Sequence, residues 1–276
     1  MYRDLLVEVD GSDAAIHRID YSVRLARRFD AHLTGLCLIR ALALPPAVGT
    51  YMTAELEAQI LDDENKRAEA VLARFRKAAS PEDIEFDTRT DRGTPQEHAD
   101  IVSLHGRYAD LTVIGQPDPD AITTSLDPGD VVMAAGGPVM IVPHIGTPKT
   151  TAENVMIAWN ASRESARAVR DSMPLLEGAK SVEVVCFRPE TTGSHGDLPG
   201  ADIGLHLSRH GIDVDVQILE GRGIDVGNAL LSHVADRGSD LLVMGCYGHS
   251  RLREAVLGGA TRTILSTMTV PVLTVH

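Results

Sequence analysis

Four glycines follow an apolar run in the stretch "LLVMGCYGHSRLREAVLGGATRTIL", residues 241–265: Gly245, Gly248, Gly258 and Gly259. An apolar run, a glycine-rich loop and a helical pattern together predict a strand, a turn and a helix. Glycines let a ligand approach the backbone, and the N–H groups that open a helix attract phosphates. Glycine-rich turns also occur for steric reasons alone. The residues by themselves leave phosphate binding and a plain structural turn both open.

Polar residues accompany this loop and a second turn. Arg251 and Arg253 could supply positive charge to a bound anion, and His249 lies beside them. In "NASRES", Asn160 and Ser162 follow an apolar run, where such side chains cap the next helix or contact a ligand. An exposed loop histidine more often has no chemical role, so we expect no catalytic group here.

A metal site, a catalytic nucleophile and a redox thiol each have little support in the sequence. His206 and His210 have i, i+4 spacing, but no third or fourth zinc ligand accompanies them, so an exposed helical face is the simpler interpretation. "GHSRL" fails the G-x-S-x-G pattern because Leu252 occupies the last position. The P-loop pattern is absent. Cys246 could be a redox-sensing thiol, although a small buried residue explains it more simply.

The sequence contains an internal repeat, so that its two halves resemble each other. "DLLVEVDGSDAAIHRIDYSVRLA" resembles "NVMIAWNASRESARAVRDSMPLL", "DLTVIG" resembles "DLLVMG", and "GPVMIVPH" resembles "VPVLTVH", in the same order. A Gly/Pro/Thr stretch, "HIGTPKTTAEN", joins the copies as a short linker would. We therefore predict two domains, residues 1–146 and 151–276.

Short apolar runs alternate with helical patterns in both copies, as expected for parallel strands covered on both faces. The second copy predicts strands near 154–159, 182–187, 212–219, 240–245 and 270–275, and helices near 163–176, 201–210, 224–237 and 259–267. The first adds a long charged helix over 53–79. The predicted fold is α/β, with two tandem doubly wound, mostly parallel five-stranded sheets.

The expected strand order, 3-2-1-4-5, reverses between the first and fourth strands of each domain. Ligands of such sheets bind beyond the carboxyl ends of the strands at that reversal. In the second domain the loops after Trp159 and Met244 meet there. The two polar turns described above therefore belong to one predicted site.

Composition limits the partners. The net charge of -13 and the lack of a Lys/Arg block disfavour nucleic acid and anionic membranes. No apolar run is long enough to span a bilayer, and no export signal opens the sequence. Three cysteines, Cys37, Cys186 and Cys246, lack metal-pair spacing, which favours reduced thiols in the cytoplasm.

Both halves resemble universal stress protein domains, whose fold is like that of adenine-nucleotide alpha hydrolases, over nearly the whole chain. The ATP-binding branch of that family carries a G-x2-G-x9-G-[ST] pattern after its fourth strand. Gly245, Gly248 and Gly258 match its three glycines, while Gly259 replaces the Ser or Thr and removes one hydroxyl contact to phosphate. The resemblance implies ATP, AMP or another adenine nucleotide as the ligand.

The resemblance also implies an Asp beside the nucleotide at the end of the first strand. Asp10 matches it in the first half, but the second half has Asn160, whose amide binds ribose without supplying charge to Mg²⁺. Whether Mg²⁺ takes part stays open. Adenine is expected near the end of the second strand. The resulting candidate nucleotide-binding residues are Ala158, Asn160, Ser162, Phe187, Gly245, Gly248, His249, Arg251, Gly258, Gly259 and Ala260.

The first half departs from the pattern after its fourth strand. There Asp118 and Pro128 stand where Gly248 and Gly258 stand in the second half, within "GQPDPDAITTSLDPGD". Carboxylates at this place would repel phosphates. We predict that the first half is mainly structural, or binds something uncharged.

A further expectation concerns the fifth strand of each predicted domain. The resemblance implies that these strands pair two domains, here as a pseudo-dimer within one chain, and Pro138 and Pro271 fit an edge or strand-start position. Association of two chains as a homodimer stays open. The sequence thus predicts a stress-response sensor or regulator that binds an adenine nucleotide mainly in its second domain. The alternatives are an interaction module without a ligand and a slow nucleotide hydrolase.

Overall fold

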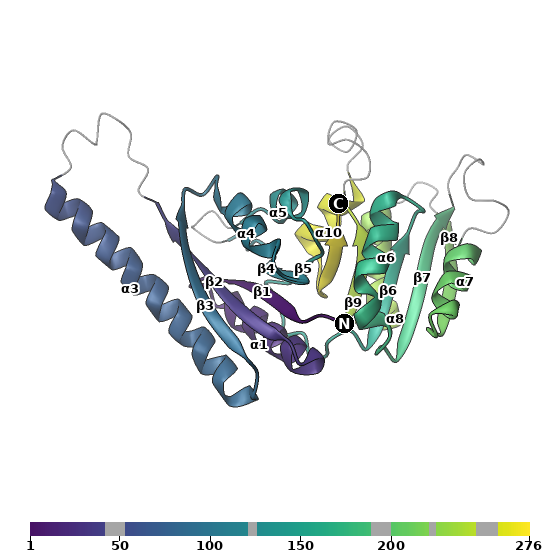
Figure 1. Ribbon diagram of the computed structural model, residues 1–276. Coiled ribbons are helices and arrows are strands. Elements are labelled where there is room, and N and C mark those ends of the chain that lie inside the picture. The colour runs from purple at the N-terminus through teal and green to yellow at the C-terminus, as the bar shows by residue number, and fades with distance from the viewer. Residues whose placement is uncertain (42–52, 121–125, 189–199, 221–224, 247–258) are drawn as a thin grey trace. The chain divides into compact units, whose positions relative to one another are not determined.

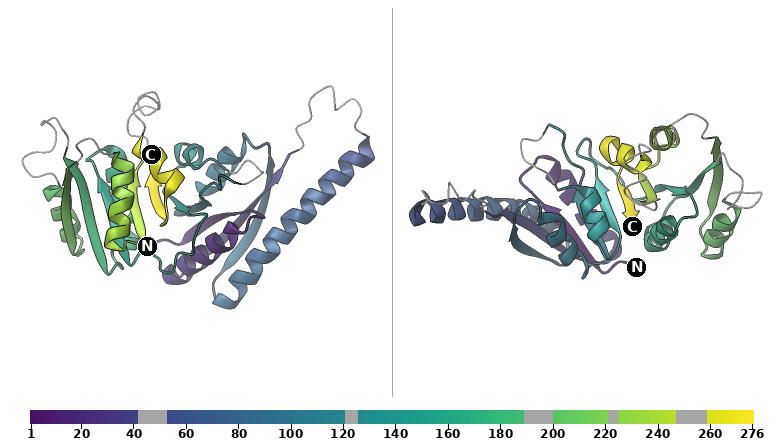
Figure 2. Two further views of the ribbon diagram at one scale, coloured as in Figure 1. Left: turned by 180° about the vertical axis from the view of Figure 1, so that it is seen from behind. Right: turned by 90° about the horizontal axis from the view of Figure 1, so that it is seen from above.

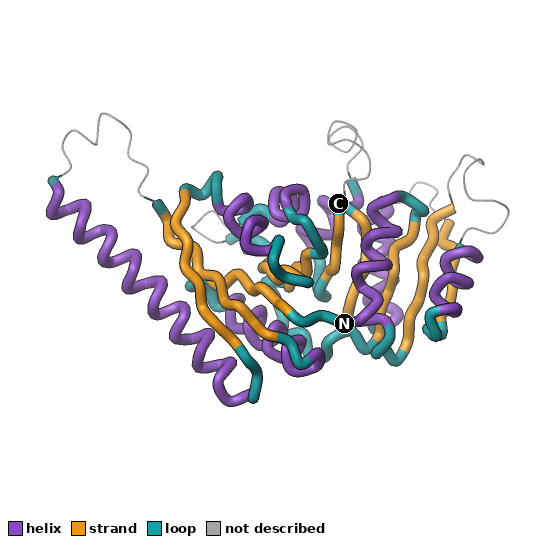
Figure 3. The backbone as a smooth tube through the Cα atoms, viewed as in Figure 1, coloured by secondary structure: helices purple, strands orange, loops and turns teal. Residues whose placement is uncertain are grey.

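The computed structural model describes residues 1–41, 53–120, 126–188, 200–220, 225–246 and 259–276. In these ranges strands alternate with helices (Figure 3), which confirms the predicted α/β class. The chain divides into two compact units, Tyr2–Gly136 and Gly137–His276, the latter together with Met1. They are called the first and second unit below. Among the described residues, no helix is both long and apolar enough to cross a membrane.

The first unit has a parallel sheet in the order β3-β2-β1-β4 (Figure 1). Helices α1 and α3 pack on one face, and α4 and α5 pack together on the other (Figure 2). The elements are β1 (Asp4–Val9), α1 (Ala14–Phe29), β2 (His32–Arg40), α3 (Ala54–Ala79), a 3₁₀ turn (Ser80–Glu82), β3 (Phe86–Gly93), α4 (His98–Gly106), β4 (Leu111–Gly115) and α5 (Pro128–Ala134).

The second unit has a sheet in the order β5-β10-β9-β6-β7-β8. Helices α6 and α8 lie on opposite faces of it, as comparison of Figure 1 with the rear view in Figure 2 makes visible. The elements are β5 (Val139–Val142), β6 (Asn154–Trp159), α6 (Arg163–Leu176), β7 (Ser181–Arg188), α7 (Ala201–Arg209), β8 (Val214–Glu220), α8 (Val226–Arg237), β9 (Leu241–Gly245), α10 (Ala260–Thr267) and β10 (Val272–Val275).

The fifth strands pair with each other. Strand β5 runs antiparallel to β10, with Ile141 opposite Val272 and Val139 opposite Thr274, while β10 runs parallel to β9. β5 comes from the first repeat of the sequence but belongs to the second compact unit. Pro138 and Pro271 directly precede the two strands, as a strand-start position requires, but β10 is an interior strand and not an edge.

Side-chain caps fix where the helices begin. Thr53 Oγ1 accepts a hydrogen bond from Leu56 N at the start of α3, and Asp225 Oδ1 accepts one from Gly227 N at the start of α8. These bonds satisfy N–H groups that have no partner inside the helix. The long helix α3 is buried only in its C-terminal half, at Ala68, Leu72, Phe75 and Ala79.

Candidate functional site

In the first unit, an arginine occupies the crevice where the carboxyl ends of β1 and β4 diverge. Arg18, on α1, donates from Nε to the Glu8 carbonyl oxygen at 2.7 Å. Its Nη2 lies 3.0 Å from Glu8 Oε2 and 3.1 Å from Asp10 Oδ2. A Cβ added to Gly115, at the end of β4, would lie 1.9 Å from Arg18 Nη1. The guanidinium therefore lies against the ends of both strands, the place where ligands of such sheets bind.

The charges in this cluster are matched internally. Burial raises the pKa of the Glu8 carboxyl to about 7, although Arg18 acts to lower it and Asp10 to raise it further. Burial also acts to raise the pKa of Asp10, but Arg18 and two hydrogen bonds from Ser12 outweigh it and lower that pKa. Asp10, the residue that the resemblance places beside a nucleotide, is thus bound to Arg18 and Ser12.

The residues predicted to keep phosphates out of the first half are Asp118 and Pro128. Asp118 is exposed and its Oδ1 accepts a hydrogen bond from Asp120 N, and Pro128 opens α5 behind the Asp127 cap. Arg18 was missed, although the internal repeat carries a signal for it. Aligning the copies puts Glu8 opposite Ala158 and Arg18 opposite Ala168. A charged pair in one copy and two alanines in the other indicate a local difference between the sites.

In the second unit, the positions aligned with Glu8 and Arg18 carry small side chains. Ala158 lies near the end of β6, partly exposed, and Ala168 is buried on α6. Asn160 is exposed, and its Oδ1 accepts a hydrogen bond from Ser162 N at 3.1 Å. Ser162 is the N-cap of α6, because its Oγ accepts from Ser165 N at 3.1 Å. Both predicted residues therefore shape the turn that leads into α6.

Gly245, the first glycine of the pattern, has a steric role. A Cβ at this position would lie 2.4 Å from Ser165 N and 2.5 Å from the carbonyl carbon of Glu164. No side chain fits between β9 and the first turn of α6. The steric interpretation, which the sequence left open beside phosphate binding, accounts for this glycine.

Glu164 lies against the same point and was not singled out from the sequence. Its side chain is buried, and its Oε1 lies 3.1 Å from Arg163 Nη2. Burial acts to raise the pKa of this carboxyl, but its own backbone N–H and Arg163 outweigh burial and lower the pKa. A carboxylate at the helix start is stabilised there by the helix dipole. Its charge also disfavours an anion directly beside it.

Two cysteines lie near the predicted adenine position and loop. Cys246 follows β9, is buried, and donates its backbone N–H to the Val275 carbonyl oxygen at 2.9 Å. Cys186 pairs in register with Trp159, and burial raises the pKa of its thiol to about 11. The backbone of Phe187 continues β7 beside it. The raised pKa makes the Cys186 thiol a poor nucleophile. The burial of Cys246 fits the structural role that the sequence offered as the simpler explanation.

The start of α10 contains the last predicted residues. Gly259 is the N-cap of α10, and its carbonyl oxygen accepts from Arg262 N at 2.9 Å, while Ala260 is the first helical residue. Gly259 thus borders this helix as expected. Gly248, His249, Arg251, Arg253 and Gly258 lie outside the described residues.

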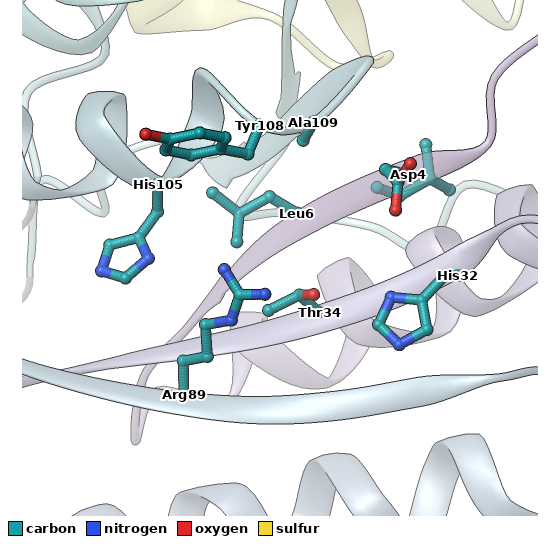
Figure 4. A pocket seen from close by; sticks show the side chains of 9 residues that line it. Asp4, Leu6, His32, Thr34, Arg89, His105, Tyr108 and Ala109 are labelled. Atoms are coloured by element: carbon teal, nitrogen blue, oxygen red, sulfur yellow. The ribbon is translucent and has the colours of Figure 1, made fainter.

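A separate cavity of about 300 Å³ opens in the first unit (Figure 4). It lies towards the amino ends of β1 and β2, the edge of the sheet opposite to the Arg18 cluster. Its polar lining consists of Asp4, His32, Thr34, Arg89, His105 and Tyr108. This cavity could not be predicted from the sequence, because its lining residues are far apart in the chain and form no motif.

Comparison with known proteins gives a consistent result. The model of the universal stress protein family matches residues 1–123 and again 151–276. A curated universal stress protein of Synechocystis sp. is 24% identical, with 99% of each chain covered. The crystal structure of a universal stress protein from Archaeoglobus fulgidus superposes with a TM-score of 0.76 at 17% identity, covering 98% of this chain and 94% of the other. A putative one from Pseudomonas aeruginosa gives 0.58 at 15% identity, covering 99% and 92%. The chain belongs to the universal stress protein family and carries two of its domains in tandem.

Proposed function

We propose that the second unit binds an adenine nucleotide, ATP or AMP, beyond the carboxyl ends of β6 and β9. The protein then acts as a nucleotide-dependent sensor or regulator in the stress response. Family membership supports the stress role. The strand order supports the location, because β6 and β9 are the strands at which the order reverses.

The observation that carries this proposal is the contrast between the two crevices. The first unit fills its crevice with Arg18 between Glu8 and Asp10. The second unit has Ala158 and Ala168 at the aligned positions, and the charged side chain described at this edge, Glu164, lies buried against Gly245. Small side chains at a strand-order reversal are what a planar base and a ribose need for close approach.

Asn160 supports a nucleotide bound without a dedicated metal carboxylate. It is exposed at the mouth of the crevice, where its amide can hydrogen-bond ribose hydroxyls. Glu164 is buried and paired with Arg163, which places its negative charge behind Gly245. We therefore expect the phosphates further along the loop, towards Gly259 and the start of α10.

One rival keeps specific support. Gly245 is required by the packing of α6, and Ser162 by its cap, so neither residue needs a ligand to explain it. An interaction module without a nucleotide would use the same scaffold. We place either form in the cytoplasm, since Cys37, Cys186 and Cys246 are all buried free thiols.

Calorimetric titration of the intact chain with ATP, AMP and cyclic AMP tests the proposal. We expect saturable binding of at least one of them, and its loss in Gly248→Asp, which copies Asp118 of the first unit. The matched control is Asp118→Gly, which leaves the second unit unchanged. Absence of heat with all three nucleotides would support the interaction module, and rapid ATP turnover would support a hydrolase.

A further inference from the structure

One position in the cavity at the amino ends of β1 and β2 has an equivalent in the second unit. The side chains at that equivalent position indicate what kind of ligand the cavity fits. Thr34 on β2 pairs in register with Leu6 and Asp87. Glu183 on β7 pairs in the same way with Met156 and Asp215. The two residues therefore occupy the same position in the two sheets, and both have an aspartate beside them on the outer strand.

In the second unit a carboxylate fills this position. Glu183 Oε2 lies 3.1 Å from His233 Nε2, and Oε1 accepts a hydrogen bond of 2.8 Å from Arg237 Nε. Arg237 also reaches Asp215 Oδ2 at 3.1 Å. The Glu183 side chain is only 10% exposed. This unit thus satisfies a buried carboxylate with a histidine and an arginine from α8, in spite of the neighbouring aspartate.

In the first unit the same position has no carboxylate of its own. Thr34 is too short to fill it, and within the described ranges its hydroxyl has no hydrogen-bond partner. Arg89 points from β3 into the space between His105 and Thr34 (Figure 4). Its Nη2 forms a long ion pair with Asp87 Oδ2 at 3.6 Å, a distance beyond that of a hydrogen bond. The cavity therefore has an arginine and a histidine of its own, on β3 and α4, where the second unit uses His233 and Arg237 of α8 on Glu183.

We propose that this cavity binds a small monocarboxylate, whose carboxylate takes the place that Glu183 occupies in the second unit. Arg89 binds the carboxylate, and Thr34 donates to it. Asp91 holds His105 at 3.1 Å and keeps that ring in the cavity wall. Asp4 lines the cavity as well and repels a second carboxylate, so dicarboxylates are excluded. This site is independent of the proposed nucleotide site, which lies in the other unit.

Propionate is the probe of choice, because it reproduces the side chain of Glu183 from its β carbon to its carboxylate. Titration of the intact protein, followed by protein amide shifts in NMR, should give saturable binding with shifts at Thr34 and Arg89. A ligand of so few atoms is expected to bind in the millimolar range, roughly 4 kcal/mol. Succinate should bind at least about tenfold more weakly.

Two variants and one control decide the matter. Arg89→Leu should weaken propionate binding about tenfold or more, because it removes a charge-assisted hydrogen bond. Thr34→Glu should abolish binding and raise the melting temperature, because it supplies the carboxylate from within. Arg92→Leu, on the same strand but outside this cavity, should bind as the wild type does.

Three results would overturn the assignment. The first is an absence of saturation by propionate at concentrations up to about 100 mM, well above the expected range. The second is unchanged binding in Arg89→Leu, which stays informative even if Thr34→Glu fails to fold. The third is tighter binding of inorganic phosphate than of propionate, which would replace the carboxylate with a general anion.

Discussion

Arg18 and its two carboxylates are the residues that most clearly separate the two units. The second repeat has two alanines in place of Glu8 and Arg18, which removes the buried ion pair from this strand end. Breaking a buried ion pair leaves an uncompensated charge, whereas replacing both partners by apolar residues is often nearly neutral. The cluster should therefore respond very differently to single and double substitution.

Arg18→Leu should destabilise the first unit by about 3 kcal/mol at pH 8, because buried Glu8 loses its partner and must then stay charged without one or take up a proton. Glu8→Leu combined with Arg18→Leu should recover most of that loss, because the buried carboxylate is gone and Asp10, which is partly exposed, keeps its hydrogen bonds from Ser12. Urea unfolding of both variants and the wild type measures this. Equal destabilisation of the single and double variants would show that the guanidinium contributes packing and not charge compensation.

Glu8 also predicts a pH dependence of stability. Its folded pKa, raised by burial to about 7, lies above the ordinary value of 4.5. The folded state then holds a proton that the unfolded state releases, so this group stabilises the fold fully below pH 4.5. That contribution falls as pH rises towards 7, by an amount on the order of 3 kcal/mol.

Glu8→Gln isolates this effect, because glutamine stays neutral at every pH. The stability of the variant relative to the wild type should rise between pH 4.5 and 7 and stay constant above. Burial lowers the pKa of His98, which makes stability change with pH in the opposite direction. This contribution is the same in the variant and the wild type, so it cancels in the difference between them. Asp10 does not interfere, since its lowered pKa moves its titration below this window. A pH-independent difference would contradict the account of Glu8.

At the scale of elements, the contact between a helix and the end of a strand differs in the two units. The first turn of α6 lies directly against Gly245, at the end of β9. At Gly115, at the end of β4, the three atoms nearest to an added Cβ all belong to the Arg18 side chain. In the second unit, helix backbone thus lies against the end of the strand. In the first unit, a guanidinium lies there.

Alanine substitutions distinguish these contacts. Gly245→Ala should cost about 1–3 kcal/mol, because backbone cannot move away from the new methyl group. Gly115→Ala should be similarly costly in the wild type but better tolerated together with Arg18→Leu. Gly137→Ala is the control, since an added Cβ there meets nothing within 4 Å. If the cost of Gly115→Ala were the same in both backgrounds, Arg18 would not be the obstacle.

The elements themselves could be predicted from the sequence. The expected helix over 163–176 has those bounds, and the long helix over 53–79 is α3, Ala54–Ala79, capped by Thr53. Apolar periodicity and capping residues are local signals, so they can be read along the chain. Arg18 and Glu183 could not be placed in this way, because their partners come from other elements. For Arg18, the alignment of the two repeats is the one sequence signal.

At the scale of the whole chain, β5 is the main departure from a simple duplication, because the repeat that contains it and the compact unit that contains it differ. The strand belongs by sequence to the first repeat and by contact to the second unit, where it pairs with β10. Met140 in β5 is fully buried opposite Leu273. The second unit therefore depends on residues that precede its own repeat.

Met140→Asp should destabilise the second unit by several kcal/mol, because it buries a carboxylate without a partner. Native-state hydrogen exchange should show lost protection in β6, β9 and β10 before β1 and β2. Val113→Asp, at a buried position of β4, is the matched substitution and should reverse that order. Loss of protection starting in β1 and β2 of Met140→Asp would contradict the assignment of β5.

Isothermal titration of the intact chain with ATP, repeated on the double variant Ala158→Glu, Ala168→Arg, tests the central claim most directly. The variant gives the second unit the charged pair that fills the first, and Ala166→Arg on the exposed side of α6 controls for added charge. The account predicts one ATP per chain, bound by the wild type and the control and lost in the double variant. A stoichiometry of two, or undiminished binding in the double variant, would contradict it.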